Sequence, residues 1–172
     1  MRARLLVLAV SLLFVTNAVN SQTRTFTRDN LEYILELPSP SWQPVSRLDI
    51  HDHFEFIYES NPANGDLTLR KRLVDAGVPP AELFRFDEKW EFERLPGYVV
   101  CSSCDGESFT GNLSGAVFSY EFVSGGDVVA GRIYYLQIDT RTFYSLRFTV
   151  PQKKLTSMRR EMDSIARSFR LK

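Results

Sequence analysis

One predicted strand, residues 128–138, is apolar on both of its faces, and this constrains the fold more than any other segment. In an extended chain, successive side chains point to opposite sides. Both sets are large and apolar: Tyr134, Leu136 and Ile138 on one face, and Val129, Ile133 and Tyr135 on the other. A strand of this kind has to be covered on both sides. The segment therefore predicts a sheet that lies between two layers of other structure.

Six more segments are predicted strands, most of them with the apolar–polar alternation of half-buried strands. They are residues 31–37, 53–60, 66–74, 98–101, 115–123 and 142–150. Residues 61–65 and 124–127 are rich in turn-forming Asn, Gly, Pro and Asp, so the strands beside each are predicted to form hairpins. Residues 38–41 (Pro-Ser-Pro-Ser) end the first strand. We expect Trp42 to fold back from the following loop into the core.

Two segments have the spacing of helices. The first begins at Pro79-Pro80, where proline is tolerated in the first turn, and runs to about residue 94. Its apolar residues Leu83, Phe86 and Trp90 recur at helical spacing. The second helix covers residues 152–169. Its apolar stripe is spaced by three and four residues: Leu155, Met158, Met162, Ile165 and Phe169.

These two helices supply the covering layers that the central strand requires. The predicted fold class is therefore α+β, an antiparallel β-sheet flanked by helices in an α/β/α sandwich. We expect the last helix to pack on the sheet, with a core that includes Tyr134, Leu136, Phe148 and Met162.

The first 21 residues have the features of a secretory signal peptide. A basic start is followed by an apolar run of eleven residues, 5–15, and then by small residues. This run is well short of the ~20 residues that a membrane span needs. We expect cleavage after Ser21, with Ala18 as the alternative site. A single domain over residues 22–172 would then be exported and soluble, in the periplasm or outside the cell.

Charge and composition exclude several classes of partner and of fold for the predicted mature chain, residues 22–172. Without Arg2 and Arg4 it has 19 basic and 21 acidic residues, a net charge of −2. A near-neutral domain gives no electrostatic reason to expect nucleic acid as a partner. The full sequence has thirteen phenylalanines, of which only Phe14 lies in the predicted signal peptide, and seven tyrosines. This aromatic content suits a packed β-rich interior rather than a disordered chain. Two cysteines are too few for a disulfide scaffold, so the fold depends on its hydrophobic core.

Several features together resemble one known superfamily. They are a strand that ends in Leu37-Pro38 before Trp42, a tyrosine-rich hairpin (residues 132–136 with 143–148), and a last helix that ends in Ile165-Ala166-Arg167-Ser168-Phe169. The pattern resembles the PsbP-like α/β/α sandwich superfamily, which holds the extrinsic P subunit of photosystem II, the Ran-binding Mog proteins and exported bacterial proteins. The resemblance spans most of residues 25–172 and implies non-enzymatic binding or assembly work. It assigns no functional residue, because fold does not imply function.

Cys101 and Cys104 form a Cys-x-x-Cys motif that invites a redox interpretation. In an oxidoreductase the first cysteine caps a helix, whose N-terminus lowers the pKa of the thiol. Here Asp105-Gly106 favours a turn, and the acidic Asp105 and Glu107 would raise that pKa. We therefore expect a structural disulfide between the two cysteines, formed in an oxidising compartment.

His51 and His53 share one face of a predicted strand with Glu55. Two imidazoles and a carboxylate could hold a divalent metal, and Cys101 and Cys104 could complete a four-ligand site. An exposed polar face on a half-buried strand explains the same residues. A thiol-redox or metal-dependent enzyme built on these two pairs is the alternative function.

The C-terminal segment has five more basic than acidic residues. The charges are Lys153, Lys154, Arg159, Arg160, Arg167, Arg170 and Lys172 against Glu161 and Asp163. We expect Lys153, Lys154, Arg160 and Arg167 to project outward, where they could bind an anionic partner such as a membrane surface or a cell-wall polymer. A solvated helix face, with cations that complement the helix dipole, explains them too.

The sequence contains no serine elbow, phosphate-binding glycine loop or Cys–His dyad close in sequence. Asn112-Leu113-Ser114 is a glycosylation sequon, which matters only in a eukaryotic source. The sequence therefore favours an exported, non-catalytic binding or assembly module of the cell envelope. We assign it no catalytic residue and no cofactor, and its envelope or extracellular partner is unknown.

Overall fold

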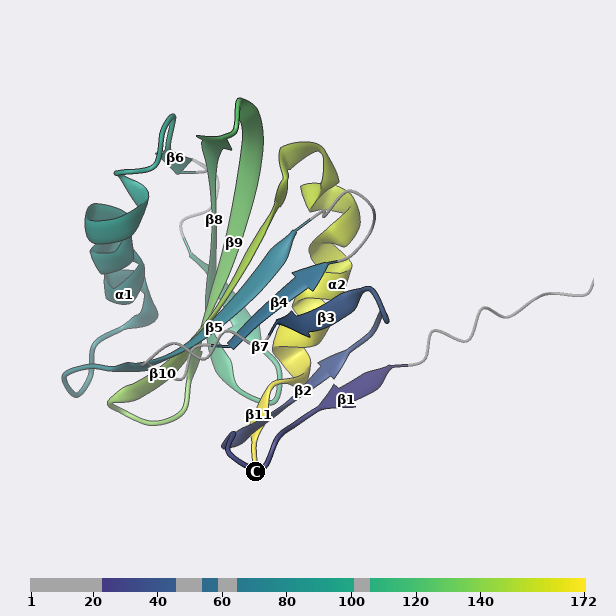
Figure 1. Cartoon of the computed structure of the whole chain (residues 1–172). Coiled ribbons are helices and arrows are strands. Elements are labelled where there is room, and N and C mark those ends of the chain that lie inside the picture. The colour runs from purple at the N-terminus through teal and green to yellow at the C-terminus, as the bar shows by residue number, and fades with distance from the viewer. Residues whose placement is uncertain (1–22, 46–53, 59–64, 101–105) are drawn as a thin grey trace, which may run out of the picture.

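The long central strands pair in antiparallel order and form a single sheet of eight strands (Figure 1). The structure is a computed structural model that describes residues 23–45, 54–58, 65–100 and 106–172. The sheet contains β3 (Trp42–Val45), β4 (Phe54–Tyr58), β5 (Asp66–Leu73), β6 (Val99–Val100), β7 (Glu107–Thr110), β8 (Ser114–Ser124), β9 (Asp127–Gln137) and β10 (Thr142–Pro151). Their order is β3-β4-β5-β10-β9-β8-β6, and β7 pairs with β8.

A second, smaller sheet joins the two ends of the described chain. It consists of β1 (Arg24–Phe26), β2 (Tyr33–Leu37) and β11 (Arg170–Leu171), with β2 in the centre. Both pairings are antiparallel, and Arg170 lies opposite Ile34. The last residues are thereby hydrogen-bonded to the beginning of the fold.

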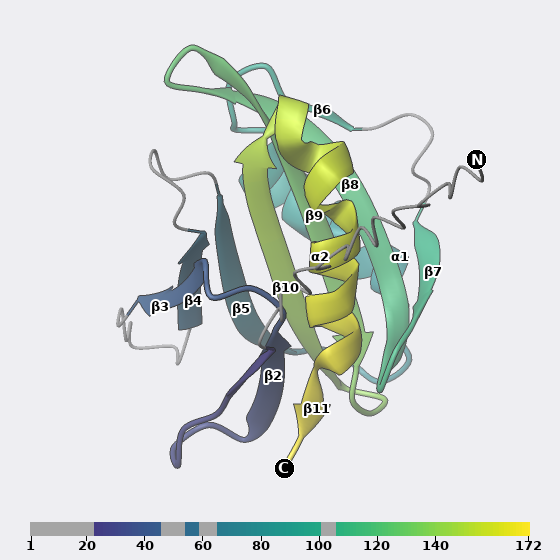
Figure 2. The same cartoon turned by 90° about the vertical axis from the view of Figure 1, so that its right-hand side faces the viewer.

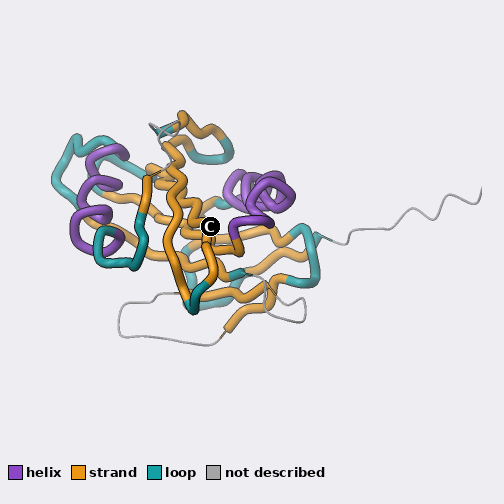
Figure 3. Tube along the Cα trace, turned by 90° about the horizontal axis from the view of Figure 1, so that it is seen from above, coloured by secondary structure: helices purple, strands orange, loops and turns teal. Residues whose placement is uncertain are grey.

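Two helices lie on opposite faces of the main sheet (Figures 2 and 3). Helix α1 (Pro80–Asp87) continues into a π-helical turn, Glu88–Phe92. Helix α2 (Leu155–Ser168) follows a 3₁₀ turn, Gln152–Lys154. The arrangement confirms the predicted α+β sandwich. Within the described part of the chain, no helix has both the length and the apolarity to cross a membrane.

Strand β9 separates two hydrophobic cores, as its alternation predicts. Tyr134 and Leu136 belong to the core under α2, whereas Ile133 and Tyr135 belong to the core under α1. The predicted core is confirmed, since its four members are all fully buried: Tyr134, Leu136, Phe148 and Met162.

A glycine fixes how closely the α1 layer approaches the sheet. A Cβ atom on Gly131 in β9 would lie 2.2 Å from the ring of Tyr120. Because Gly131 has no side chain, the Tyr120 ring can lie over the strand, and Phe92 stacks on that ring at 4.3 Å. The end of the π-helical turn is therefore held against the sheet by aromatic packing.

The structure corrects one expectation and adds short strands. Trp42 is fully buried, as predicted, but it begins strand β3 rather than lying in a loop. Strands β1, β3, β7 and β11 have four residues or fewer. Alternation over so few residues carries little signal, and their pairing depends on partners distant in the sequence.

Candidate functional site

Helix α2 turns its apolar stripe to the sheet. Met158, Met162 and Ile165 are buried, Leu155 is half-buried, and Phe169, the residue after the helix, is fully buried. The predicted stripe is thus confirmed, and the opposite side of the helix faces solvent.

Both acidic residues of α2 are directed toward the sheet. Glu161 accepts a hydrogen bond from the indole N–H of Trp42 at 3.0 Å, and burial raises the pKa of its carboxyl group. Asp163 accepts a 2.5 Å hydrogen bond from the hydroxyl of Tyr134 and a 3.2 Å bond from the guanidinium of Arg132. Burial also raises the pKa of Tyr134, so this hydroxyl stays protonated and acts as the hydrogen-bond donor to Asp163.

The outer face of α2 is consequently cationic. Lys153, Arg160 and Arg167 are exposed, and Lys154 is half-buried. In the described part of the structure, no carboxylate forms an ion pair with any of these four, although the Arg167 guanidinium lies 5.9 Å from the centre of the Phe109 ring. Arg159 differs, because it pairs with Glu107 at 2.8 Å. The neighbouring exposed side chains are small and polar: Thr156, Ser157 and Ser164.

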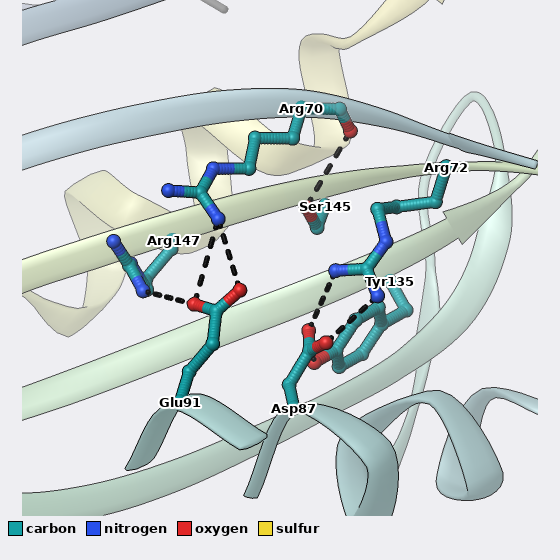
Figure 4. A network of polar contacts seen from close by, with 7 residues as sticks. All are labelled: Arg70, Arg72, Asp87, Glu91, Tyr135, Ser145 and Arg147. Atoms are coloured by element: carbon teal, nitrogen blue, oxygen red, sulfur yellow. Dashed lines mark hydrogen bonds and ion pairs between the residues drawn. The ribbon is translucent and has the colours of Figure 1, made fainter. Parts of the chain in front are cut away.

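On the other face of the sheet, charged residues connect α1 to β5 (Figure 4). Asp87, which is 3% exposed, accepts two hydrogen bonds from the guanidinium of Arg72, at 2.8 and 3.0 Å. The hydroxyl of Tyr135 donates a third bond to Asp87 at 2.7 Å. A buried carboxylate with three donors is well satisfied. Asp87 therefore fixes the end of α1 on the sheet.

The π-helical turn adds a second anchor. Glu91 lies between Arg70 of β5, at 3.1 Å, and Arg147 of β10, at 3.2 Å (Figure 4). The cavity among these side chains is about 10 Å³, room for about one water molecule. The charged groups of the network are paired with one another, so the network attaches α1 to the sheet and does not enclose a ligand.

This attachment leaves two aromatic side chains on the outer side of α1 and the π-helical turn. Phe86 is 55% exposed and Trp90 is 50% exposed, and their ring centres are 6.3 Å apart. The buried side of the segment is instead formed by Leu83, Phe84 and Phe92, and Phe84 stacks on Phe118 at 4.3 Å. Of the three apolar residues at helical spacing in the sequence, only Leu83 enters the core.

The metal and disulfide predictions concern four other residues. His51, His53, Cys101 and Cys104 lie outside the described residues, so the metal and disulfide hypotheses remain predictions. Within the described ranges, no three His, Cys, Asp or Glu side chains are placed to hold a metal ion. Asn112 of the sequon is exposed, and its side-chain amide donates to the carbonyl of Ser168 at 3.2 Å.

The sequence analysis missed the arginines under α1. Their signal is the alternation in β5, where Leu67 and Leu69 are buried in one core while Arg70 and Arg72 face the other side. An arginine on the face of a strand that lies under a helix indicates that the helix supplies its acidic partner. The sequence does not identify those partners, because they lie on a helix that follows the strand.

The fold has known counterparts among solved structures. A scan against protein-family models and a search of curated proteins both find no match. Among solved structures, LpqN of Mycobacterium tuberculosis, described as involved in cell envelope biogenesis, is similar over 86% of this chain and 89% of its own, with 17% identity and a TM-score of 0.54.

Two further structures are similar at lower identity. The cyanobacterial PsbP protein CyanoP of Synechocystis matches over 91% of this chain and 96% of its own, with 9% identity and a TM-score of 0.62. The Ran-binding protein Mog1p of Saccharomyces cerevisiae matches over 88% and 96%, with 10% identity and a TM-score of 0.60. Likeness at such identities shows the fold alone, and that fold is the PsbP-like sandwich expected from the sequence.

Proposed function

Given its PsbP/Mog-type fold, we propose that the protein is an exported, non-catalytic binding or assembly module of the cell envelope, and that the outer face of α2 binds an anionic partner. The observation that carries this proposal is the division of charge on α2. Glu161 and Asp163 are used by Trp42, Tyr134 and Arg132, while Lys153, Arg160 and Arg167 have no carboxylate partner among the described residues.

This division concentrates positive charge on one side of a slightly acidic protein. Cations without nearby acids attract an anionic surface and orient the protein toward it. The exposed hydroxyls of Thr156 and Ser164 between them add hydrogen-bond donors for phosphate or carboxylate oxygens. The chemistry of this face therefore suits a polyanion.

The roles of two structural neighbours support the proposal. Mog1p is described as a Ran-binding protein, and LpqN as involved in cell envelope biogenesis. The predicted signal peptide, residues 1–21, would deliver this chain to the envelope. N-terminal sequencing of the exported protein tests the delivery: we expect a mature chain that begins at Gln22, and retention of residues 1–21 would contradict it.

The binding test reverses charge on α2. We expect Lys153→Glu, Arg160→Glu and Arg167→Glu together to abolish retention of the mature protein on immobilised polyphosphate. Retention of the unmodified protein should weaken as NaCl rises, because salt screens charges over about 8–10 Å.

The matched control makes the same charge change on the opposite helix, with Arg85→Glu, Lys89→Glu and Arg94→Glu. These side chains are all exposed. We expect this variant to keep its retention on polyphosphate. If both triple variants lose retention equally, net charge rather than the α2 face is responsible. If neither does, the outer face of α2 is only a solvated surface.

A further inference from the structure

The exposed aromatic pair lies on a well-anchored segment, with Phe86 in α1 and Trp90 in the π-helical turn that follows it. Phe86 and Trp90 are half-exposed although Asp87 and Glu91, their neighbours along the chain, are fixed to Arg72, Arg70 and Arg147. The rings are therefore presented on an ordered support. An exposed apolar pair held in this way indicates an interaction surface.

The charges of the segment separate in the same manner as on α2. Asp87, Glu88 and Glu91 are bound by the sheet or by Tyr98, whose hydroxyl donates to Glu88 at 3.1 Å. Three cations are exposed on the segment: Arg85, Lys89 and Arg94. They outnumber the two exposed acids, Glu82 and Glu93.

Two of these cations lie over the larger ring. Lys89 Nζ lies 5.6 Å from the Trp90 ring centre, and the Arg94 guanidinium carbon lies 5.8 Å from it. Phe86 has the guanidinium of Arg72 at 6.0 Å. A cation therefore lies over each exposed ring, although the Arg72 charge over Phe86 is already paired with Asp87. The two exposed cations over Trp90 suit an apolar phase with negative charge at its surface.

A lipid surface fits this face better than a protein does. A stable protein interface buries about 800 Å² on each partner, whereas this face offers two rings on the convex side of a short helix. Tryptophan and phenylalanine with a cationic border are typical of segments that lie in the membrane interface. We propose that the Phe86–Trp90 face docks on an anionic lipid bilayer, with its rings among the headgroups and Arg85, Lys89 and Arg94 near the lipid phosphates.

This inference goes beyond the function proposed for α2. The two helices lie on opposite faces of the sheet (Figure 2). Docking through α1 directs the cationic face of α2 away from the bilayer, where it is free to bind another partner. Two rings and three cations give weak, reversible membrane binding, as expected of one small interfacial contact.

Vesicle sedimentation of the mature protein tests the docking. We expect binding to vesicles that contain phosphatidylglycerol and little binding to phosphatidylcholine vesicles. Phe86→Ala with Trp90→Ala should reduce binding at least about tenfold, because the apolar contact is lost. Leu171→Ala, which shortens a 40% exposed apolar residue on β11, is the matched control and should bind normally.

The α2 charge-reversal variant separates this proposal from the previous one. It should still bind the anionic vesicles through α1. If that variant loses vesicle binding while the Phe86→Ala, Trp90→Ala protein keeps it, α2 is the membrane-binding face and the proposal is wrong. Absence of binding to anionic vesicles at low salt also overturns it. A concentration-dependent dimer that the double alanine variant abolishes would identify a second copy of the chain as the occupant.

Tryptophan fluorescence reports which face touches the lipid. The chain has two tryptophans, of which Trp42 is fully buried and Trp90 is 50% exposed. We expect anionic vesicles to shift the emission to shorter wavelength and to protect it from iodide. Trp90→Phe, which keeps an aromatic ring, should bind without any spectral change. Binding of the unmodified protein without a shift would mean that another face meets the bilayer.

Discussion

The indole N–H of Trp42 donates a hydrogen bond to Oε1 of Glu161, which lies 119 positions later in the chain. This bond connects the edge strand β3 to helix α2. It also holds one of the two acidic side chains of the helix toward the sheet, so the same contact stabilises the fold and leaves the outer face cationic.

Trp42→Phe should destabilise the protein by about 1–3 kcal/mol, because the half-buried carboxylate of Glu161 loses its donor. Glu161→Gln keeps an acceptor at the same position and should change the free energy of unfolding by less than about 1 kcal/mol. Urea unfolding of both variants measures the difference. A loss below about 0.5 kcal/mol for Trp42→Phe would show that the hydrogen bond of the indole does not stabilise the fold.

Met162→Ala should destabilise the protein by about 2–5 kcal/mol, because it leaves a cavity at a fully buried position under α2. Thr156→Ala on the exposed side of the same helix is the control and should change stability by less than about 0.5 kcal/mol. Denaturant unfolding gives both values. A loss below half a kcal/mol for Met162→Ala would show that the helix is not docked there.

Asp87→Ala should be among the most damaging single changes on the α1 side. It leaves the guanidinium of Arg72 and the hydroxyl of Tyr135 without their acceptor, and removal of one partner from a buried ion pair costs about 3–5 kcal/mol. Asp87→Ala with Arg72→Met should recover part of that loss, since no unpaired charge is left. A double variant less stable than Asp87→Ala would mean that the pair is not coupled.

The sequence predicted the layers of this fold because the relevant signals are local and long. Residues 128–138 alternate over the whole strand β9, and the stripe of α2 repeats over its full length, so each segment shows which side is buried. The small sheet was not predictable in this way. Its strands β1 and β11 have three and two residues and pair across most of the chain, so they depend on the fold that surrounds them.

The candidate surfaces were predictable only in part. The surplus of cations in the last helix was visible in the sequence, but the inward direction of Glu161 and Asp163 depends on Trp42 and Arg132, which are far away in the chain. The exposure of Trp90 was hidden for another reason. A π-helical turn contains one residue more than an α-helical turn. Residues 88–92 therefore depart from the α-helical spacing that placed Trp90 on the same face as Leu83 in the sequence analysis.

The last prediction concerns Asp66 at the start of β5, where pH should affect stability. Burial raises the pKa of its carboxyl group to about 6 from an ordinary value of 3.8, against the opposing effect of the Arg147 charge. The unfolded chain therefore releases this proton at lower pH than the folded protein. The stability contribution is fully present below about pH 4 and is lost as the pH rises through 6.

Asp66→Asn removes this dependence, because an amide does not titrate. We expect the stability of the variant relative to the unmodified protein to increase by about 1–2 kcal/mol between pH 4 and pH 7, a range that allows for partial solvent screening. Urea unfolding at several pH values measures it, and the comparison cancels the contributions of all other titrating groups. Thr68→Val, at the next inward position of the strand, is a non-titrating control that should leave the pH profile parallel to that of the unmodified protein. A constant difference between Asp66→Asn and the unmodified protein across this range would mean that Asp66 is ionised in the folded state well below pH 6.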